Sequence, residues 1–348
     1  MSVFHPNSPV RIFFISALVT IILGTVVLKY TGLAGLWLFV ILVFLEVTFS
    51  FDNAVINSKV LSRMSDLWQK IFLTVGIFIA VFVVRFLLPI VIVMVATHLN
   101  FGQVVHLALY DADEYGEILY HASPMINAFG GAFLMMIGVT YFINRKKDIH
   151  WLGLIEEKLS NAGRFENLKV FILLSVAAIL YFTVEPSYKT IVLVASVLGI
   201  ILHIGLSLFG ELFGEHQAKS TAKQVGWAAF ASFVYLEVLD ASFSFDGVIG
   251  AFAITDSVIL IVAGLGAGAI WVRSFTIYLL RSGTLSKYRY LEHGAHWAIL
   301  ALGSLMVAKL YHFEPPEWVT GSIGILFITT AIASSIIERR RMQRVQQD

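Results

Sequence analysis

Long runs of apolar residues, separated by short polar stretches, recur along the whole chain. A helix that crosses the hydrocarbon core of a bilayer needs about 20 predominantly apolar residues. The runs are close to that length, so the pattern predicts about ten transmembrane helices. The predicted spans are residues 11–29, 33–58, 70–97, 124–143, 168–184, 189–214, 226–252, 256–281, 295–311 and 318–338.

The composition agrees with a membrane protein. Of the 348 residues, 58% are hydrophobic and 14% are charged, whereas a soluble domain has about 45 to 50% and about 25%. The first apolar run is not followed by a small-residue cleavage site, so we expect it to be retained as a helix. The sequence therefore predicts an all-α integral membrane protein whose partner is the lipid bilayer, and it gives no indication of nucleic-acid binding.

Basic residues distinguish the two sides of the membrane. Cytoplasmic loops carry an excess of Lys and Arg. Placing the N-terminus in the cytoplasm puts nearly all of the 24 Lys and Arg on that side, apart from Lys29, Lys189 and Lys309 near the outer face and two arginines inside spans. The C-terminus is then cytoplasmic as well. The longest outer connection, 98–122, has four acids and no Lys or Arg, and we interpret it as a solvated acidic loop rather than a vestibule that collects cations.

One acidic motif occurs twice. Residues 46–53 read EVTFSFDN and residues 240–247 read DASFSFDG, so the two segments align without a gap. A repeated block at such a separation indicates that the chain consists of two related halves. The matching acids are Glu46 with Asp240 and Asp52 with Asp246.

A second similarity follows in the next span of each half, where a single arginine, Arg85 or Arg273, interrupts an apolar run. Five predicted spans separate the motif copies, so the two copies cross the membrane in opposite directions. Inverted repeats are a recurrent transporter architecture, with substrate bound near the midplane. We therefore predict two inverted five-helix repeats, residues 1–188, with an amphipathic inner-surface helix at 148–166, and residues 189–348, with a basic cytoplasmic tail.

Ionised carboxylates inside a bilayer are costly. Even on the mild insertion scales one costs about 2.5 to 3.5 kcal/mol at the bilayer centre. Protonation, an arginine or a bound cation each offsets this cost, and an acidic surplus remains after the arginines are counted. The sequence has no cysteine, which leaves oxygen ligands and histidine as the available metal chemistry, and oxygen ligands suit the harder divalent cations. The candidate metal ligands are Glu46, Ser50, Asp52, Asn53, Glu237, Asp240, Ser244 and Asp246.

An unbroken helix does not bring both acids of one motif to one ion. Positions six apart on an α-helix point about 120° apart. Either the helix is interrupted around Ser50 to Asn53, or the two acids serve different steps. Gly247 and Gly250 favour an interruption in the second copy, because glycine costs about 1 kcal/mol inside a helix.

The remaining polar residues have simpler interpretations beside the functional ones. His203 lies in the middle of a predicted span and is a candidate proton carrier, although an interhelical hydrogen bond is the simpler interpretation. Arg85 and Arg273 are counter-ions or gating residues, and pairing with acids alone explains them. The paired motifs also fit a buried polar network that only locks the two halves together.

The motifs resemble those of the TerC family of bacterial membrane proteins, whose signature is an acid followed by a Ser-x-Asp-Asn core. The first copy has Glu46 and the core Ser50 to Asn53, whereas the second has Gly247 in place of the Asn and offers no amide ligand there. The resemblance covers nearly the whole chain as two halves. It implies an exporter of Mn²⁺ or a similar divalent cation in the bacterial inner membrane, linked to tellurite resistance.

Three functions fit these features. The first is a secondary transporter of Mn²⁺ or another divalent cation, with no organic cofactor and no enzymatic activity. The sequence has no nucleotide-binding loop, so an ion gradient or the membrane potential supplies the energy, and protons are the expected coupling ion. The second is an intramembrane aspartyl protease with Asp52 and Asp246 as its dyad, although the Gly-x-Gly-Asp element of those proteases is absent. The third is a metal sensor or assembly partner that binds without transport.

Overall fold

The computed structural model describes residues 8–345 apart from 146, 148, 166, 215–222, 253, 256 and 314. In this part of the chain the backbone forms helices joined by turns, and the only extended pairing is one parallel bridge between Met64 and Gln224. The prediction of an all-α protein is therefore confirmed.

The chain separates into two compact units, each of which combines segments that are far apart in the sequence. Unit 1 comprises Met1–Ser123 and Phe209–Ser282, and unit 2 comprises Pro124–Leu208 and Gly283–Asp348. Each unit therefore draws residues from both predicted repeats, 1–188 and 189–348.

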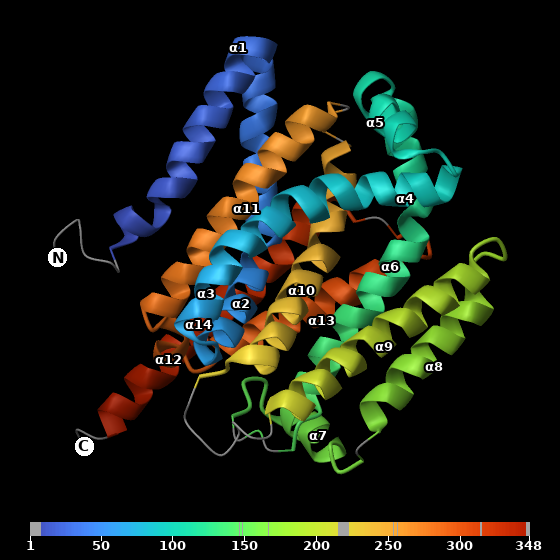
Figure 1. Ribbon diagram of the computed structural model, residues 1–348. Helices are drawn as coiled ribbons and strands as arrows, with labels where there is room; N and C mark the ends of the chain where they lie inside the picture. The colour runs from blue at the N-terminus through green and yellow to red at the C-terminus, as the bar shows by residue number, and fades with distance from the viewer. Residues whose placement is uncertain are drawn as a thin grey trace. The chain divides into compact units, whose positions relative to one another are not determined.

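Unit 1 contains the elements that carry the repeated motifs (Figure 1). Its main packing partners are α1 with α11, α2 with α11, and the π-helix η2 with α10 and α11. The bounds are α1 Pro9–Phe49, α2 Phe51–Arg63, α3 Asp66–Ile71, η1 Phe72–Gly76, η2 Ile79–Leu87, α4 Leu88–Thr97, α5 Phe101–Tyr110, α10 Gly226–Phe252 and α11 Val258–Arg281.

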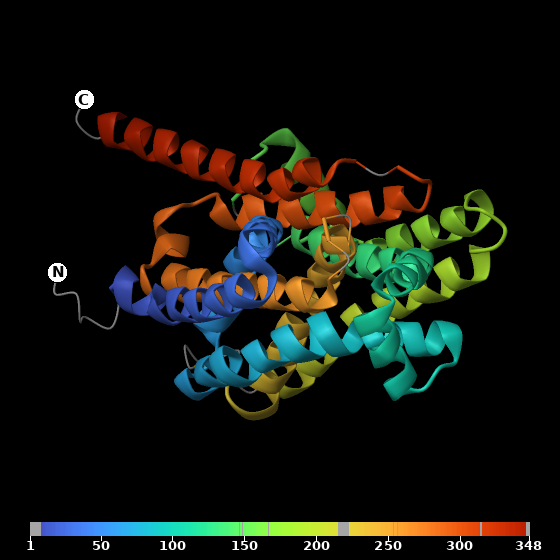
Figure 2. The same ribbon diagram turned by 90° about the horizontal axis from the view of Figure 1, so that it is seen from above.

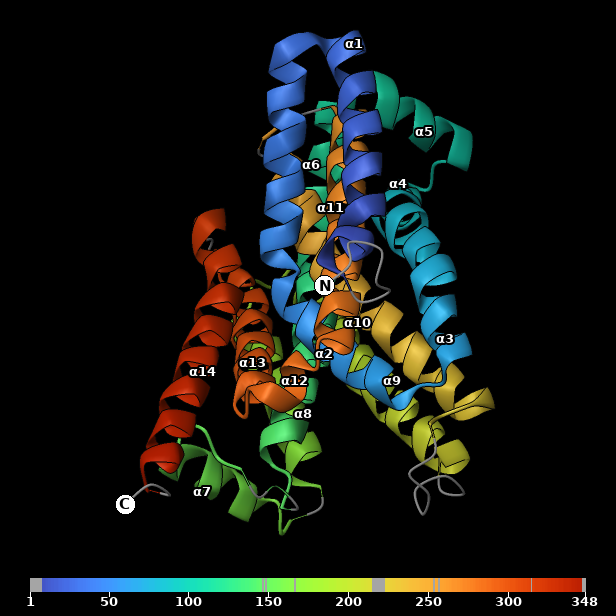
Figure 3. The same cartoon turned by 90° about the vertical axis from the view of Figure 1, so that its left-hand side faces the viewer.

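Unit 2 consists of the remaining helices, and α6 and α9 each pass from one unit into the other. Figure 2 and Figure 3 both show α13 and α14 side by side, and the two helices contact one another along their lengths. The bounds are α6 Ala112–Phe142, α7 Leu154–Ala162, α8 Leu168–Thr183, α9 Lys189–Gly214, α12 Thr284–Lys287, α13 Leu291–Lys309 and α14 Glu317–Val345.

Seven helices in the described part of the chain are long and apolar enough to cross a membrane. They lie in Pro9–Phe49, Asp66–Val95, Ala112–Phe142, Lys189–Phe209, Gly226–Phe252, Val258–Arg281 and Ser322–Gln343. The protein is therefore a multi-pass membrane protein by helix length and composition. Two shorter apolar helices, Phe101–Tyr110 and Leu168–Thr183, lie between them.

The first of these helices, α1, is a hairpin rather than one rod. A straight helix of its 41 residues would be about 60 Å long, twice the thickness of the hydrocarbon core. The helix reverses at Gly32, where φ is 71° and ψ is −166°, and Figure 3 shows the two arms side by side. A Cβ added at Gly24 on one arm would lie 3.4 Å from the side chain of Leu36 on the other.

The connection at residues 98–122, expected as a loop, is largely helical. Asn100 and Gln103 form a reciprocal capping box that starts α5, and α6 begins directly after Asp111. The expectation that the acids of this segment are solvated is met, because Asp111, Asp113, Glu114 and Glu117 are all exposed.

Within the predicted amphipathic stretch 148–166 the structure has the helix α7, Leu154–Ala162, and two of its polar residues face the protein. Glu156 and Ser160 are buried, whereas Leu154 and Ile155 are exposed. Hydrogen bonds that Glu156 accepts within unit 2 account for this orientation. The apolar side chains are left facing outward, as in a helix that lies on a membrane surface.

Candidate ion-binding site

The first motif copy spans a break between two helices. α1 ends at Phe49 and α2 begins at Phe51, while Ser50 between them has φ −104° and ψ 13°. The Ser50 hydroxyl donates a hydrogen bond of 2.8 Å to Oε1 of Glu46, four residues earlier. Of the two alternatives that the sequence left open, the structure has the interrupted helix, with Glu46 at the end of one helix and Asp52 in the first turn of the next.

The second copy lies on a continuous helix. α10 runs unbroken from Gly226 to Phe252, so the interruption expected from Gly247 and Gly250 is wrong. Glu237, Asp240 and Ser244 are spaced by three and four residues and therefore share one face of α10. This helix packs against α1, α2 and η2.

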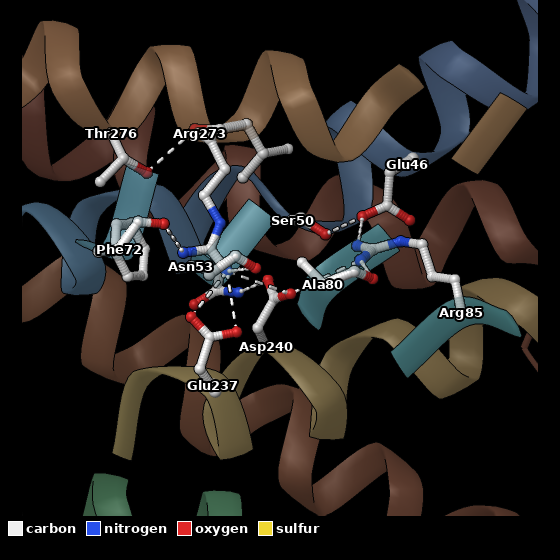
Figure 4. A network of polar contacts seen from close by, with 12 residues as sticks. Glu46, Ser50, Asn53, Phe72, Ala80, Arg85, Glu237, Asp240, Arg273 and Thr276 are labelled. Atoms are coloured by element: carbon white, nitrogen blue, oxygen red, sulfur yellow. Dashed lines mark hydrogen bonds and ion pairs between the residues drawn. The ribbon is translucent and has the colours of Figure 1, made fainter. Parts of the chain in front are cut away.

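Arg85 on η2 joins the two motif copies. Its Nη2 donates to Glu46 Oε1 at 2.5 Å, and its Nη1 lies 3.6 Å from Asp240 Oδ2. The same Nη1 also donates to the backbone carbonyl of Ala80 on its own helix. Asn53 completes the link, since its Nδ2 donates to Asp240 Oδ1 at 2.9 Å (Figure 4).

Arg273 on α11 makes the corresponding pair in the second half. Its Nη2 lies 3.2 and 3.3 Å from the two oxygens of Glu237 and 3.8 Å from Asp240 Oδ2. Two backbone carbonyls, of Phe72 and Gly76 in η1, also accept from its guanidinium. The guanidinium further stacks on the Phe72 ring, 3.7 Å from the ring centroid.

These contacts form one network, which we call the acid–arginine network. Asp240 lies between the two arginines, with Glu46 on one side and Glu237 on the other (Figure 4). Every member is less than 9% exposed. Its members are Glu46, Ser50, Asn53, Arg85, Glu237, Asp240 and Arg273.

Two glycines make room for the network. A Cβ at Gly268 of α11 would lie 2.5 Å from Cβ of Glu46. A Cβ at Gly76 would lie 2.6 Å from Oε1 of Glu237 and 3.0 Å from Nη1 of Arg273. A larger residue at Gly268 would push α11 away from Glu46, and one at Gly76 would displace the carboxylate of Glu237 and the guanidinium of Arg273.

Asp52 is buried beside the network but has no comparable partner. It is 0% exposed, and neither carboxylate oxygen accepts a hydrogen bond from any described residue that meets ordinary geometric limits. It lies in the first turn of α2, where free backbone N–H groups favour negative charge. Asp52 is therefore a buried acid with no side-chain counter-ion.

Other buried oxygens near the motifs are also unpartnered among the described residues. They are the Oδ1 atoms of Asn53 and Asn57 and the hydroxyl of Ser244, while Asp240 Oδ2 has ion-pair contacts only. The sequence reasoning did not include Asn57, although an amide one turn after Asn53 in an apolar span was a visible signal. All of these atoms belong to oxygen types that bind hard divalent cations.

The predicted ligands are thus brought together only in part. Glu46, Ser50, Asn53, Glu237 and Asp240 join the network, whereas Asp52 and Ser244 are buried without hydrogen-bond partners. The side chain of Asp246 lies outside the described part of the structure. In the arrangement described, no three His, Asp or Glu side chains are grouped so that they could hold a metal ion. The positive groups that contact the acids in this arrangement are the two arginines, Arg85 and Arg273.

His203 belongs to unit 2. It is buried, and its ring lies edge-on to Phe133 with the centroids 6.0 Å apart. Its Nδ1 has no hydrogen-bond partner among the described residues. The interhelical hydrogen bond expected for His203 is therefore not made through Nδ1 in the described part of the chain.

Comparison with known proteins identifies the family alone. No curated protein and no solved structure matches the chain. A family model does match residues 51–342, which include the second motif copy, both arginines and the last three residues of the first motif copy, but not Glu46 or Ser50. The chain therefore belongs to the family described as "Protein of unknown function (DUF475)".

Proposed function

We propose that the protein is a secondary transporter that moves Mn²⁺ or a similar divalent cation across the bacterial inner membrane through the acid–arginine network and Asp52. The observation that carries the proposal is Asp52, which is fully buried and has no hydrogen-bond partner among the described residues. A carboxylate in that setting needs a positive partner, and a transported cation supplies one.

The charge balance supports a cation of more than one charge. Glu46, Asp52, Glu237 and Asp240 are four buried acids, and Arg85 and Arg273 are the two arginines that face them. Four ionised acids against two arginines leave a surplus of two negative charges. A single divalent cation offsets that surplus, and the unpartnered oxygens of Asn53, Asn57 and Ser244 supply neutral ligands.

The repeated organisation supports transport over a static polar core. Unit 1 holds the helices of both motif copies and both arginines, and each arginine pairs with an acid of its own half. Ten helices in two inverted repeats, with a broken motif helix in the first half, form part of our proposal. Export as the direction follows from the resemblance to the TerC family.

The test is cation flux into proteoliposomes that contain the purified protein. Asp52→Asn keeps the shape of the side chain and removes its charge, so we expect a folded protein whose Mn²⁺ flux falls to the level of empty vesicles. Asp113→Asn, which changes an exposed acid of α6, is the matched control and keeps full flux. A pH-sensitive dye in the same vesicles reports whether protons move in the opposite direction.

Two outcomes would contradict the proposal. Normal flux in a folded Asp52→Asn protein would remove Asp52 from the transport path. Binding of Mn²⁺ by the wild-type protein without any flux would favour the sensor or assembly role instead.

A further inference from the structure

We propose that Arg85 is an internal competitor of the transported cation, occupying Glu46 and Asp240 when the cation is absent and leaving them when it binds. This inference rests on the proposed transport function. It assigns different roles to two arginines that occupy equivalent places in the repeated sequence.

Arg85 is buried, and not all of its N–H donors have a hydrogen-bond partner among the described residues. Of its donors, one reaches Glu46, another reaches the carbonyl of Ala80, and Nε has no partner in the described part of the chain. Its approach to Asp240, at 3.6 Å, is an ion pair without a hydrogen bond. A guanidinium that served only as a structural bridge is expected to make paired, well-aligned contacts with a carboxylate.

Arg273 makes more contacts than Arg85. It contacts both oxygens of Glu237, two carbonyls of η1 and the face of the Phe72 ring. Each of these contacts would be lost if the side chain moved. Arg273 is therefore the fixed counter-ion of the network, and Arg85 is the one whose departure costs fewer contacts.

The carboxylates that Arg85 contacts suit a cation in its place. Glu46 and Asp240 come from different helices, α1 and α10, and Arg85 is the side chain that bridges them. Nearby, the Oδ1 of Asn53 and the oxygens of Asp52 are unpartnered among the described residues. A divalent cation bound by these oxygens would replace the one positive charge of Arg85 with two.

The helix that carries Arg85 is suited to a change of shape. η2 is a π-helix of nine residues, and π-helical segments are rare, mostly short and frequently found at functional sites. A π-helix differs from an α-helix by its i to i+5 hydrogen bonds. Closing one such turn to α geometry would rotate Arg85 relative to Glu46 without unfolding the helix.

The experiment measures Mn²⁺ affinity of the full-length protein in detergent, from the EPR signal of free Mn²⁺. Arg85→Gln removes the competitor, so we expect Mn²⁺ binding at least about ten-fold tighter than in the wild type. A ten-fold change corresponds to a wild-type site that Arg85 occupies about 90% of the time in the absence of the cation. Arg273→Gln is the matched control, and we expect it not to tighten binding.

Arg85→Lys covers the case in which Arg85→Gln does not fold. A lysine keeps a charge beside Glu46 but has one ammonium, which does not bridge to Asp240, so an intermediate tightening is expected. Unchanged or weaker Mn²⁺ binding in the folded Arg85 variants, with wild-type binding and flux intact, overturns this inference alone. Absence of both binding and flux in the wild type overturns the transport function itself.

Discussion

Glu156 in unit 2 shows how neighbouring donors keep a fully buried acid ionised. The side chain is 0% exposed. It accepts from Lys147 at 2.9 Å, from the Trp151 backbone N–H at 3.1 Å and from the Trp297 indole at 2.9 Å, and it lies 2.7 Å from Nδ1 of His293. Burial alone would raise the pKa of Glu156, but the hydrogen bonds from His293, Lys147 and Trp297 outweigh it and hold that pKa well below its ordinary value.

Glu156→Gln is therefore expected to destabilise the protein by about 3 kcal/mol at pH 7, because it removes the carboxylate that pairs with the Lys147 side chain, which is only 8% exposed. Because the pKa of Glu156 is lowered on folding, its stabilisation is complete above about pH 4.3, the ordinary pKa of a glutamate, and is lost as the pH falls further. Denaturation of both proteins in detergent at several pH values measures this difference.

The neighbouring Glu157→Gln is the control for this measurement, since Glu157 is exposed on the same helix. Its free energy of unfolding should match the wild type at every pH. An equal loss in both variants, or a difference for Glu156→Gln that does not shrink in acid, would show that the hydrogen bonds to Glu156 do not set the stability of this region.

At the scale of elements, the apolar runs predict where helices lie but not where each helix ends. The run at 33–58 predicted one span, and the helix breaks within it at Ser50. A break was one of the two alternatives that the sequence left open, because Glu46 and Asp52 point in different directions on one helix. In the second copy the glycines Gly247 and Gly250 favoured an interruption, but α10 is continuous through both.

The reversal of α1 depends on Gly32. Its backbone conformation, φ 71° and ψ −166°, is in a region that essentially only glycine adopts, and other residues are strained there by about 1 to 3 kcal/mol. Nothing lies within 4 Å of a Cβ added at this position. Gly32→Ala is thus expected to lower the free energy of unfolding by that amount through backbone strain, as measured by denaturation in detergent.

Gly205→Ala is the control for Gly32→Ala, because it adds a Cβ without straining the backbone. Gly205 also has open space around an added Cβ, but it lies inside α9 with an ordinary helical backbone. Alanine at that position should leave stability unchanged or raise it by up to about 1 kcal/mol. A similar loss of stability in both variants would argue against strain at Gly32 as the cause.

At the scale of the whole molecule, the orientation in the membrane is a prediction from the distribution of Lys and Arg, and it can be tested directly. The chain has no cysteine, so a single introduced cysteine is the only target of a maleimide. Asp113 in α6 and Lys158 in α7 are both exposed, and the predicted topology places them on opposite sides of the membrane. A membrane-impermeant maleimide should label Asp113→Cys in intact cells and Lys158→Cys only after permeabilisation. Labelling of both in intact cells would reject the predicted orientation.

The sequence by itself was sufficient for the membrane environment, the helical class and the identity of the residues that form the acid–arginine network. The length of the apolar runs, the uneven distribution of Lys and Arg and the duplicated acidic motif can all be read from the sequence without knowledge of the fold. The pairing of Arg85 with Glu46, and of Arg273 with Glu237, matches the counter-ion role expected of these arginines.

Only the tertiary structure decided which acids have partners. Glu46 and Asp240 are equivalent in the repeat, yet Asp240 contacts both arginines while Glu46 contacts one. Asp52, in the first turn of the helix that follows Ser50, has no hydrogen-bond partner among the described residues. Such differences arise from contacts between residues that are distant in sequence, and helical periodicity describes only the direction of each side chain around its own helix.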